Sequence, residues 1–189
     1  SDMAKKTASP HESSSEGNQI AITVTEKGPY LVTGNPPLAM QFIMPDSEGE
    51  SWYFQEGRHF STEKEPTALC RCGLSRSKPY CDGSHLKGEW DSAITSGEDR
   101  ITDEVEITEG QRVTLNDNEK YCVFARFCHP YGGVWDLTAA SGDSQSRKLA
   151  VREASMCPSA RLTAWDNRTG KPYEFIFEPS LGLLSLIHI

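Results

Sequence analysis

Sixteen residues from Cys70 to His85 read CRCGLSRSKPYCDGSH, and they determine how the chain around them must be arranged. Turn formers such as Gly73 and Pro79 break the segment, and it has no apolar repeat, so it predicts a loop. Thiolates with a single imidazole suit both iron–sulfur clusters and zinc. The segment therefore predicts a metal-binding loop whose ligands are Cys70, Cys72, Cys81 and His85.

The spacing of the first two cysteines favours iron without excluding zinc. Structural zinc sites usually place about two to four residues between paired cysteines. Only Arg71 separates Cys70 from Cys72. A loop in which these residues bind no metal is disfavoured, because reduced cysteines rarely crowd a Gly/Pro-rich segment without a ligand.

Written as C-x-C-x2-S-x3-P-x-C-D-G-S-H, the segment resembles the CDGSH iron–sulfur (mitoNEET-like) family at every motif position. The resemblance implies a small, β-rich cap-and-loop domain that holds a [2Fe-2S] cluster. It also implies that Cys70 and Cys72 bind one iron, while Cys81 and His85 bind the other.

Charged neighbours of the loop fit a negatively charged cluster. Asp82 is the one acid within the motif, and it can cap a short helix over residues 84–86 that would orient His85. The cations could offset the charge of the cluster or could simply form a solvated basic loop. These cations are Arg71, Arg76, Lys78 and Lys87.

The composition of the chain limits the class of protein and the partners to be expected. The chain has 189 residues, 37% of them hydrophobic, and a formal charge of −8, which predicts an acidic soluble protein of one or two small domains. The acidity argues against a nucleic-acid partner. No stretch is apolar enough to span a bilayer, and the first residues lack the order of a signal peptide. We therefore expect a cytoplasmic protein without membrane contacts.

The segments around the loop predict an α+β protein in two parts. Residues 1–19 are polar and Ser-rich, which is typical of a disordered tail. Residues 20–110 form the expected CDGSH domain, because alternating or aromatic runs separated by turn formers predict strands and hairpins. These runs lie at 20–24, 30–33, 40–44, 52–54, 90–94 and 101–107.

A second group of cysteines lies in residues 111–178. Cys122 and Cys128 form the pattern C-x2-A-x2-C, and Cys157-Pro158 follows. This resembles single-cluster bacterial ferredoxins, with Ala125 in place of the middle cysteine. The resemblance implies a small ferredoxin-like α+β region with a [3Fe-4S] cluster, or a [4Fe-4S] cluster with a labile or non-cysteine ligand. His129 is a candidate for that ligand.

A predicted helix supports this second site. Asp143 can cap a helix over residues 144–156, on which Ala150, Ala154 and Cys157 share one face. Strands are expected at 161–165 and 173–177. The alternative is that the three cysteines bind nothing and pack as small apolar residues, a common role of buried cysteine.

An enzyme is not expected. Ser84-His85 and Cys128-His129 place a nucleophile beside a base in sequence, where the two rarely face each other, and no third orienting group is evident. No Gly-rich phosphate loop occurs. We expect a non-enzymatic protein.

The last residues, 179–189, end in the apolar run LSLIHI at 184–189, which we expect to be partly non-native. Longer relatives of this arrangement carry a second CDGSH motif, so the resemblance implies a C-terminally truncated member. We therefore expect a homodimer, or pairing with a missing C-terminal half.

The expected function is electron transfer or iron–sulfur cluster delivery to a redox or cluster-acceptor protein. An imidazole in place of a thiolate raises the potential, and a ring nitrogen of His85 could exchange a proton. Two alternatives remain. One is a structural zinc module that mediates protein contacts, and the other is a redox subunit that is active only on a larger partner.

Overall fold

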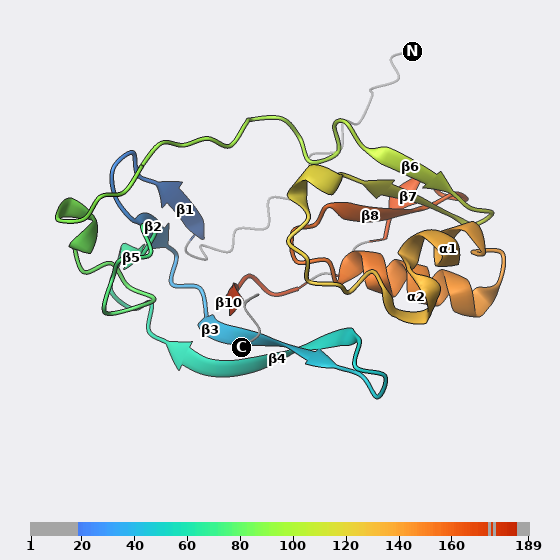
Figure 1. Cartoon of the computed structure of the whole chain (residues 1–189), viewed down its shortest axis with the longest axis horizontal. Coiled ribbons are helices and arrows are strands. Elements are labelled where there is room, and N and C mark those ends of the chain that lie inside the picture. The colour runs from blue at the N-terminus through green and yellow to red at the C-terminus, as the bar shows by residue number, and fades with distance from the viewer. Residues whose placement is uncertain (1–18, 174, 176, 185–189) are drawn as a thin grey trace, which may run out of the picture. The chain divides into compact units, whose positions relative to one another are not determined.

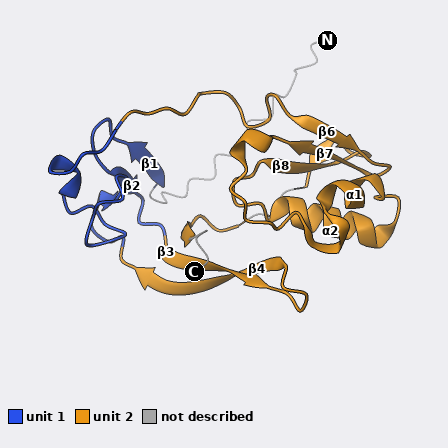
Figure 2. Cartoon of the chain, in the orientation of Figure 1, with its two compact units in different colours: residues 1–36, 62–92 blue, residues 37–61, 93–189 orange. Residues whose placement is uncertain are grey.

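The computed structural model describes residues 19–173, 175 and 177–184, so most of the predicted tail and residues 185–189 lie outside it. Two compact units make up the chain (Figure 2). The first contains residues 1–36 and 62–92, and the second contains residues 37–61 and 93–189. Small sheets and two α-helices confirm the α+β fold class. The predicted domain boundaries at 19, 110 and 178 remain predictions.

The first unit contains a three-stranded antiparallel sheet in the order β1-β2-β5. Strands β1 (Ala21–Val24) and β2 (Tyr30–Thr33) confirm the predicted hairpin. The short strand β5 (Thr67–Leu69), which the sequence did not predict, pairs with β2 and ends immediately before Cys70. A 3-10 helix, η1 (Ser84–Leu86), closes the metal-binding loop.

The second unit contains a long hairpin of β3 (Leu38–Pro45) and β4 (Ser51–Phe60), which confirms the strands predicted at 40–44 and 52–54. Asp46 shapes its turn, because Oδ1 of this residue accepts hydrogen bonds from the amides of Glu48 and Glu50. Strand β10 (Leu181–Leu184) pairs with β3 in parallel. Leu184, the first residue of the LSLIHI run, is thus part of a strand.

The rest of the second unit is a four-stranded antiparallel sheet with two helices packed together and against it (Figure 1). Valine and leucine at alternate positions of β7, together with Val134 of α1 and Ala154 of α2, form the core of this sheet–helix layer, and Cys128 belongs to it. The elements are β6 (Glu106–Glu109), β7 (Val113–Asp117), η2 (Glu119–Tyr121), η3 (Pro130–Gly132), α1 (Val134–Ala139), α2 (Ser144–Ser155), β8 (Leu162–Asp166) and β9 (Lys171–Pro172).

Two strand predictions were wrong or misplaced. Residues 90–94 and 101–105 contain no strand. Near position 90, tertiary contacts replace strand pairing: the Trp90 ring lies against the Arg71 guanidinium, which also binds the Ser92 carbonyl. Residues 174 and 176 of the strand expected at 173–177 lie outside the described residues, so that strand stays a prediction; β9 ends at Pro172, and Tyr173 packs against the core. In the part of the chain that the structure describes, no helix could cross a membrane.

Candidate metal centres

The metal-binding loop is an extension of the sheet of the first unit. Leu69, at the end of β5, forms a bridge with Tyr80. The amide of Cys70 donates to the Pro79 carbonyl at 2.8 Å, and the amide of Cys81 donates to the Ala68 carbonyl at 2.8 Å. These backbone bonds fold the loop back on itself. Cys70 and Cys81 are eleven residues apart in sequence. Because of these bonds, the chain leaves the sheet at the same place at both cysteines.

The four predicted ligands of this loop form two close pairs. The sulfurs of Cys70 and Cys72 lie 3.8 Å apart. The sulfur of Cys81 lies 3.4 Å from Nδ1 of His85. Two sulfurs on one tetrahedral metal, at bonds of about 2.3 Å, lie about 3.8 Å apart, and a sulfur and an imidazole nitrogen lie about 3.6 Å apart. Each pair therefore has the spacing of two ligands on one metal atom.

No three His, Cys, Asp or Glu side chains in the described parts of the chain converge on a site for a single ion. All four loop ligands are half-buried. The four predicted ligands therefore form two pairs near the edge of the sheet.

Backbone amides favour the thiolate form in the first pair. Burial raises the pKa of the Cys70 thiol, but hydrogen bonds from the amides of Ser75 and Gly73 and from Cys72 outweigh it and leave the pKa below its ordinary value. The amide of Leu74 also donates to the sulfur of Cys72, at 3.4 Å. Because thiolates are the ligand form of cysteine, this loop is prepared for a metal.

Asp82 supports the turn that leads into η1, although it is not the N-cap that the sequence predicted. Its Oδ1 accepts a hydrogen bond from the Ser84 amide at 3.0 Å, and its Oδ2 accepts one from the Arg76 amide at 2.9 Å. Hydrogen bonds from Ser84 and the Arg76 amide hold the pKa of Asp82 well below its usual range. The N-cap of η1 is Gly83, with φ of 82°, so Asp82 lies one position before the N-cap.

Arg71 ties the loop to the rest of its unit. Its guanidinium donates to the carbonyls of Gly28, Thr25 and Glu26 at 3.0–3.1 Å, and to that of Ser92 at 3.0 Å. It also lies over the Trp90 ring, 4.6 Å from the centroid. The sequence predicted Arg71 only as one of the cations that could offset the negative charge of a cluster. Its structural role depends on carbonyls far away in sequence, which no local pattern reveals.

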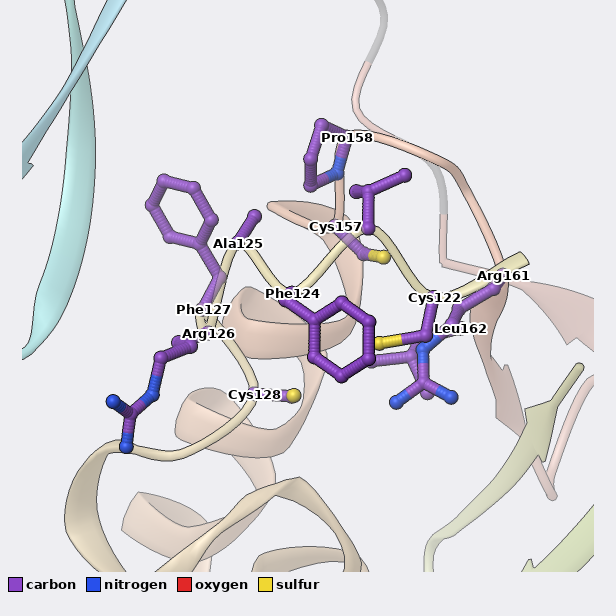
Figure 3. Close-up of a pocket in the computed structure, with 11 residues that line it drawn as sticks. Cys122, Phe124, Ala125, Arg126, Phe127, Cys128, Cys157, Pro158, Arg161 and Leu162 are labelled. Atoms are coloured by element: carbon purple, nitrogen blue, oxygen red, sulfur yellow. The ribbon is translucent and has the colours of Figure 1, made fainter. Parts of the chain in front are cut away.

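The second predicted site is also assembled. Cys122 follows η2, Cys128 precedes η3, and Cys157 follows α2, and all three line one pocket with Ala125 and Arg161. Figure 3 shows the three sulfurs around this shared space. Ala125 is 8% exposed. The structure therefore brings together three cysteines that are spread over thirty-six residues, with alanine at the position of the missing cysteine.

A buried ion pair supports this pocket. Arg161 Nη1 lies 2.7 Å from Asp117 Oδ1, and both side chains are almost fully buried. The Trp135 indole donates to the other Asp117 oxygen at 3.2 Å. Burial raises the pKa of the Cys128 thiol, and the charge and hydrogen bond of Arg161 oppose that rise. The sequence reading missed Arg161, although a cation four residues after Cys157 was a signal that could have suggested it.

Two family models match the chain. Residues 27–86 match the iron-binding zinc finger CDGSH type, and residues 108–167 match the divergent 4Fe-4S mono-cluster. We call these two matched parts the CDGSH region and the mono-cluster region. The two matches support an iron–sulfur protein and an iron–sulfur cofactor. No curated protein and no solved structure gave a match.

The CDGSH match includes the β3–β4 hairpin, but that hairpin packs on the mono-cluster region, within the second unit. Phe54 of β4 contacts Phe127, the neighbour of Cys128, with ring centroids 4.7 Å apart. Trp52 contacts the Tyr131 ring and accepts a hydrogen bond from Arg152 at its carbonyl. The Arg152 guanidinium also lies 3.9 Å from the Trp52 centroid. The hairpin is thus part of the support of the mono-cluster pocket.

The backbone of the mono-cluster loop is held in an unusual conformation. Phe124 and Arg126, on either side of Ala125, have φ of 57° and 64°. Such left-handed positions cost roughly 1–2 kcal/mol each for residues other than glycine, and they persist where the surrounding structure imposes them. His129, the candidate extra ligand, is exposed and stacks edge-on against Trp135, outside the pocket lining.

Proposed function

We propose that the chain is a non-enzymatic electron carrier whose CDGSH region holds a [2Fe-2S] cluster through Cys70, Cys72, Cys81 and His85. The observation that carries this proposal is the spacing of the two donor pairs, 3.8 Å and 3.4 Å. Two pairs with this spacing match two iron atoms with two protein ligands each.

Each residue of the loop has a definite task. Cys70 and Cys72 hold one iron, and the amide donors around them favour the thiolate form. The imidazole of His85 uses Nδ1 toward the metal, because that nitrogen faces Cys81. A Cβ on Gly28 would lie 3.9 Å from His85 Nε2, so glycine leaves this nitrogen with open space on one side.

The bound cluster would supply a site that takes up and releases one electron. A neutral imidazole in place of a thiolate makes the site less negative and raises its potential. The protein keeps the ligands in place through the backbone bonds of β5, the two hydrogen bonds to Asp82 and the Arg71 tether. Because the ligands are half-buried, transfer of the intact cluster to an acceptor protein is the second function we propose.

The mono-cluster region is proposed to hold a [3Fe-4S] or [4Fe-4S] cluster through Cys122, Cys128 and Cys157. Their common pocket supports this assignment. The buried Arg161 lies beside Cys128, and its positive charge would offset part of the negative charge of a cluster held by thiolates. We also propose a redox or cluster-acceptor protein as partner, a homodimer as the assembly, and a reducing compartment such as the cytoplasm.

The test is the content of iron, sulfide and zinc per chain after anaerobic purification, with an EPR spectrum before reduction. About two irons and two sulfides support a filled CDGSH site and return the other cysteines to a packing role. About five irons and six sulfides, with a signal before reduction, support [2Fe-2S] together with [3Fe-4S]. Stoichiometric zinc without sulfide would overturn the proposal in favour of a structural zinc module.

A further inference from the structure

The CDGSH loop presents two exposed leucines beside its predicted ligands. Leu74 is 43% exposed and Leu86 is 79% exposed. The amide of Leu74 donates to the sulfur of Cys72, and Leu86 directly follows His85. One exposed leucine therefore lies beside each of the two donor pairs. Single exposed apolar residues are ordinary in soluble proteins, so the meaning of these two depends on what accompanies them.

Hydrogen bonds join the two segments that carry these leucines, residues 74–78 and 84–88. Asp82 links them, because its carboxylate accepts hydrogen bonds from the amides of both Arg76 and Ser84. The Gly88 amide donates to the Ser84 carbonyl at 3.2 Å. A Cβ on Gly88 would lie only 2.5 Å from Leu74 Cδ1, so this leucine packs directly over the glycine. The two segments therefore form one surface on a fixed backbone.

Exposed cations accompany the leucines on this surface. The cations among residues 74–88 are Arg76, Lys78 and Lys87, and all three are exposed. Lys78 Nζ donates to a backbone carbonyl of the same loop at 3.1 Å. Asp82, the one acid among these residues, already accepts two amides, and the next acid is Glu89. The surface is thus positive on a chain whose formal charge is −8. We call Leu74, Arg76, Lys78, Leu86 and Lys87 the loop surface.

An acidic protein is the partner that the loop surface fits best. Complementary charges speed the encounter of two proteins and set their orientation, while apolar atoms add contact area. Transient electron-transfer complexes are small, below about 1,200 Å² of total buried area, so a few residues suffice. Nucleic acid fits less well, because the chain is acidic overall and the loop surface has no aromatic side chain on which bases could stack.

We propose that the loop surface docks an acidic redox protein whose carboxylates surround a small apolar patch. The carboxylates pair with Arg76, Lys78 and Lys87, and apolar atoms of the partner cover Leu74 and Leu86. This inference rests on the proposed function, because it names the chemistry of the partner of that carrier. Docking at this surface brings the partner next to both donor pairs.

The test measures the binding of two probe proteins to the full chain as purified. One probe is a plant-type [2Fe-2S] ferredoxin, which is small and acidic, and the other is cytochrome c, which is small and basic. Calorimetry gives the Kd at ionic strengths of about 0.01 M and about 0.15 M, where the Debye length is about 30 Å and about 8 Å. The variants are Leu86→Ser and Lys87→Glu. The matched control is Lys64→Glu, which changes an exposed lysine of the same unit outside the loop surface.

We expect ferredoxin to bind at the lower ionic strength, and its Kd to rise about tenfold or more at the higher one. Lys87→Glu should weaken this binding about tenfold, because it reverses a charge that faces the partner. Leu86→Ser should weaken it about fivefold at both ionic strengths, since salt does not screen an apolar contact. Lys64→Glu should change the Kd by less than about twofold. Neither variant of the loop surface should weaken the binding of cytochrome c.

Several outcomes would overturn the inference. Absence of ferredoxin binding at the lower ionic strength would do so, and so would binding that Leu86→Ser and Lys87→Glu leave unchanged. If Lys64→Glu weakened binding as much as Lys87→Glu, net charge alone would explain the effect. If sedimentation without any probe showed a dimer that Lys87→Glu disrupts, a second copy of the chain would occupy the surface instead of an acidic partner.

Analysis of iron, sulfide and zinc in the same sample separates this inference from the proposed function. Iron and sulfide without ferredoxin binding would overturn the inference alone. Zinc without sulfide would overturn the electron carrier, and the redox partner proposed for it would fall as well.

Discussion

The two cysteine sites of this molecule are built in opposite ways. The CDGSH loop takes all four predicted ligands from sixteen consecutive residues, and backbone hydrogen bonds hold the loop at the edge of a small sheet. The mono-cluster pocket takes its cysteines from three separate segments, with Cys128 in the apolar core and a buried ion pair beside it. The first site depends on local geometry, and the second depends on the tertiary fold.

This difference predicts different responses to mutation. In the CDGSH loop, loss of a ligand should remove the metal and leave the mono-cluster region intact. In the mono-cluster pocket, loss of a supporting residue should destabilise the fold itself, because the same side chains serve the core. The predictions below test whether the two sites are separable in this sense.

The largest effect is expected from Cys72→Ala. The change breaks the 3.8 Å sulfur pair, and one iron is left with a single protein ligand. We expect loss of about two irons and two sulfides per chain, while iron in the mono-cluster pocket stays. Metal analysis and visible absorbance check this. Ser77→Ala in the same loop serves as the control, and full retention of iron by Cys72→Ala would contradict the ligand assignment.

The second prediction concerns the buried ion pair. Arg161→Met leaves the Asp117 carboxylate buried without its partner, which typically costs about 3–5 kcal/mol. We expect urea unfolding to show that the free energy of unfolding of the second unit falls by an amount of this order. Asp117→Asn in the same chain should recover much of the loss, because it removes the uncompensated charge. If Asp117→Asn recovered none of the free energy of unfolding lost in Arg161→Met, Arg161 would stabilise the unit through packing alone.

The sequence predicted the CDGSH loop well because its information is local. The ligand set, the turn residues and the short helix over Ser84–Leu86 follow from neighbouring residues, and the structure shows that helix. The capped helix α2 was predicted for the same reason: Asp143 accepts a hydrogen bond from the Ser146 amide at 2.8 Å, as a cap should. Metal ligation itself remains a prediction.

The sequence did not predict what depends on distant partners. Arg71 binds carbonyls more than forty residues away, and Arg161 meets Asp117 across the sheet. The β10–β3 pairing joins residues far apart in the chain. The β3–β4 hairpin, which lies within the expected CDGSH domain, makes its aromatic contacts with the mono-cluster region. Each of these contacts is set by tertiary packing, which periodicity and turn signals do not encode.

The third prediction uses Glu153, which belongs to the supporting helix of the mono-cluster pocket. This residue is 1% exposed, and its two carboxyl oxygens have no hydrogen-bond partner among the described residues. Burial raises its pKa to about 8; the charge of Arg152 opposes the rise and that of Glu50 adds to it. The folded protein therefore keeps a proton that the unfolded chain releases above about pH 4.5.

The stability of the folded protein should therefore depend on the protonation of Glu153. The contribution of Glu153 to the free energy of unfolding should be largest below about pH 4.5 and should fall between there and about pH 8, by at most about 1.4 kcal/mol per pH unit. Glu153→Gln should flatten this slope in urea titrations, and the exposed Glu109→Gln should not. An unchanged slope in Glu153→Gln would assign the pH dependence to other groups.

The smallest and most direct test of separability compares two carboxylates that accept hydrogen bonds from backbone amides near the start of a helix. Asp82 accepts hydrogen bonds from backbone amides in two parts of the CDGSH loop, whereas Asp143 accepts a hydrogen bond from the Ser146 amide at the start of α2. Hydrogen bonds hold the pKa of both below the ordinary range, so their support is present near neutral pH and is lost as the pH falls through the lowered values.

Asp82→Ala should speed iron release to a chelator a few-fold, because η1 and His85 lose their anchor. Asp143→Ala should lower the thermal midpoint by a few degrees and leave that release rate unchanged. If both variants released iron from the CDGSH loop equally fast, the loop would depend on the fold of the mono-cluster region, and the contrast between a local and a tertiary site would fail.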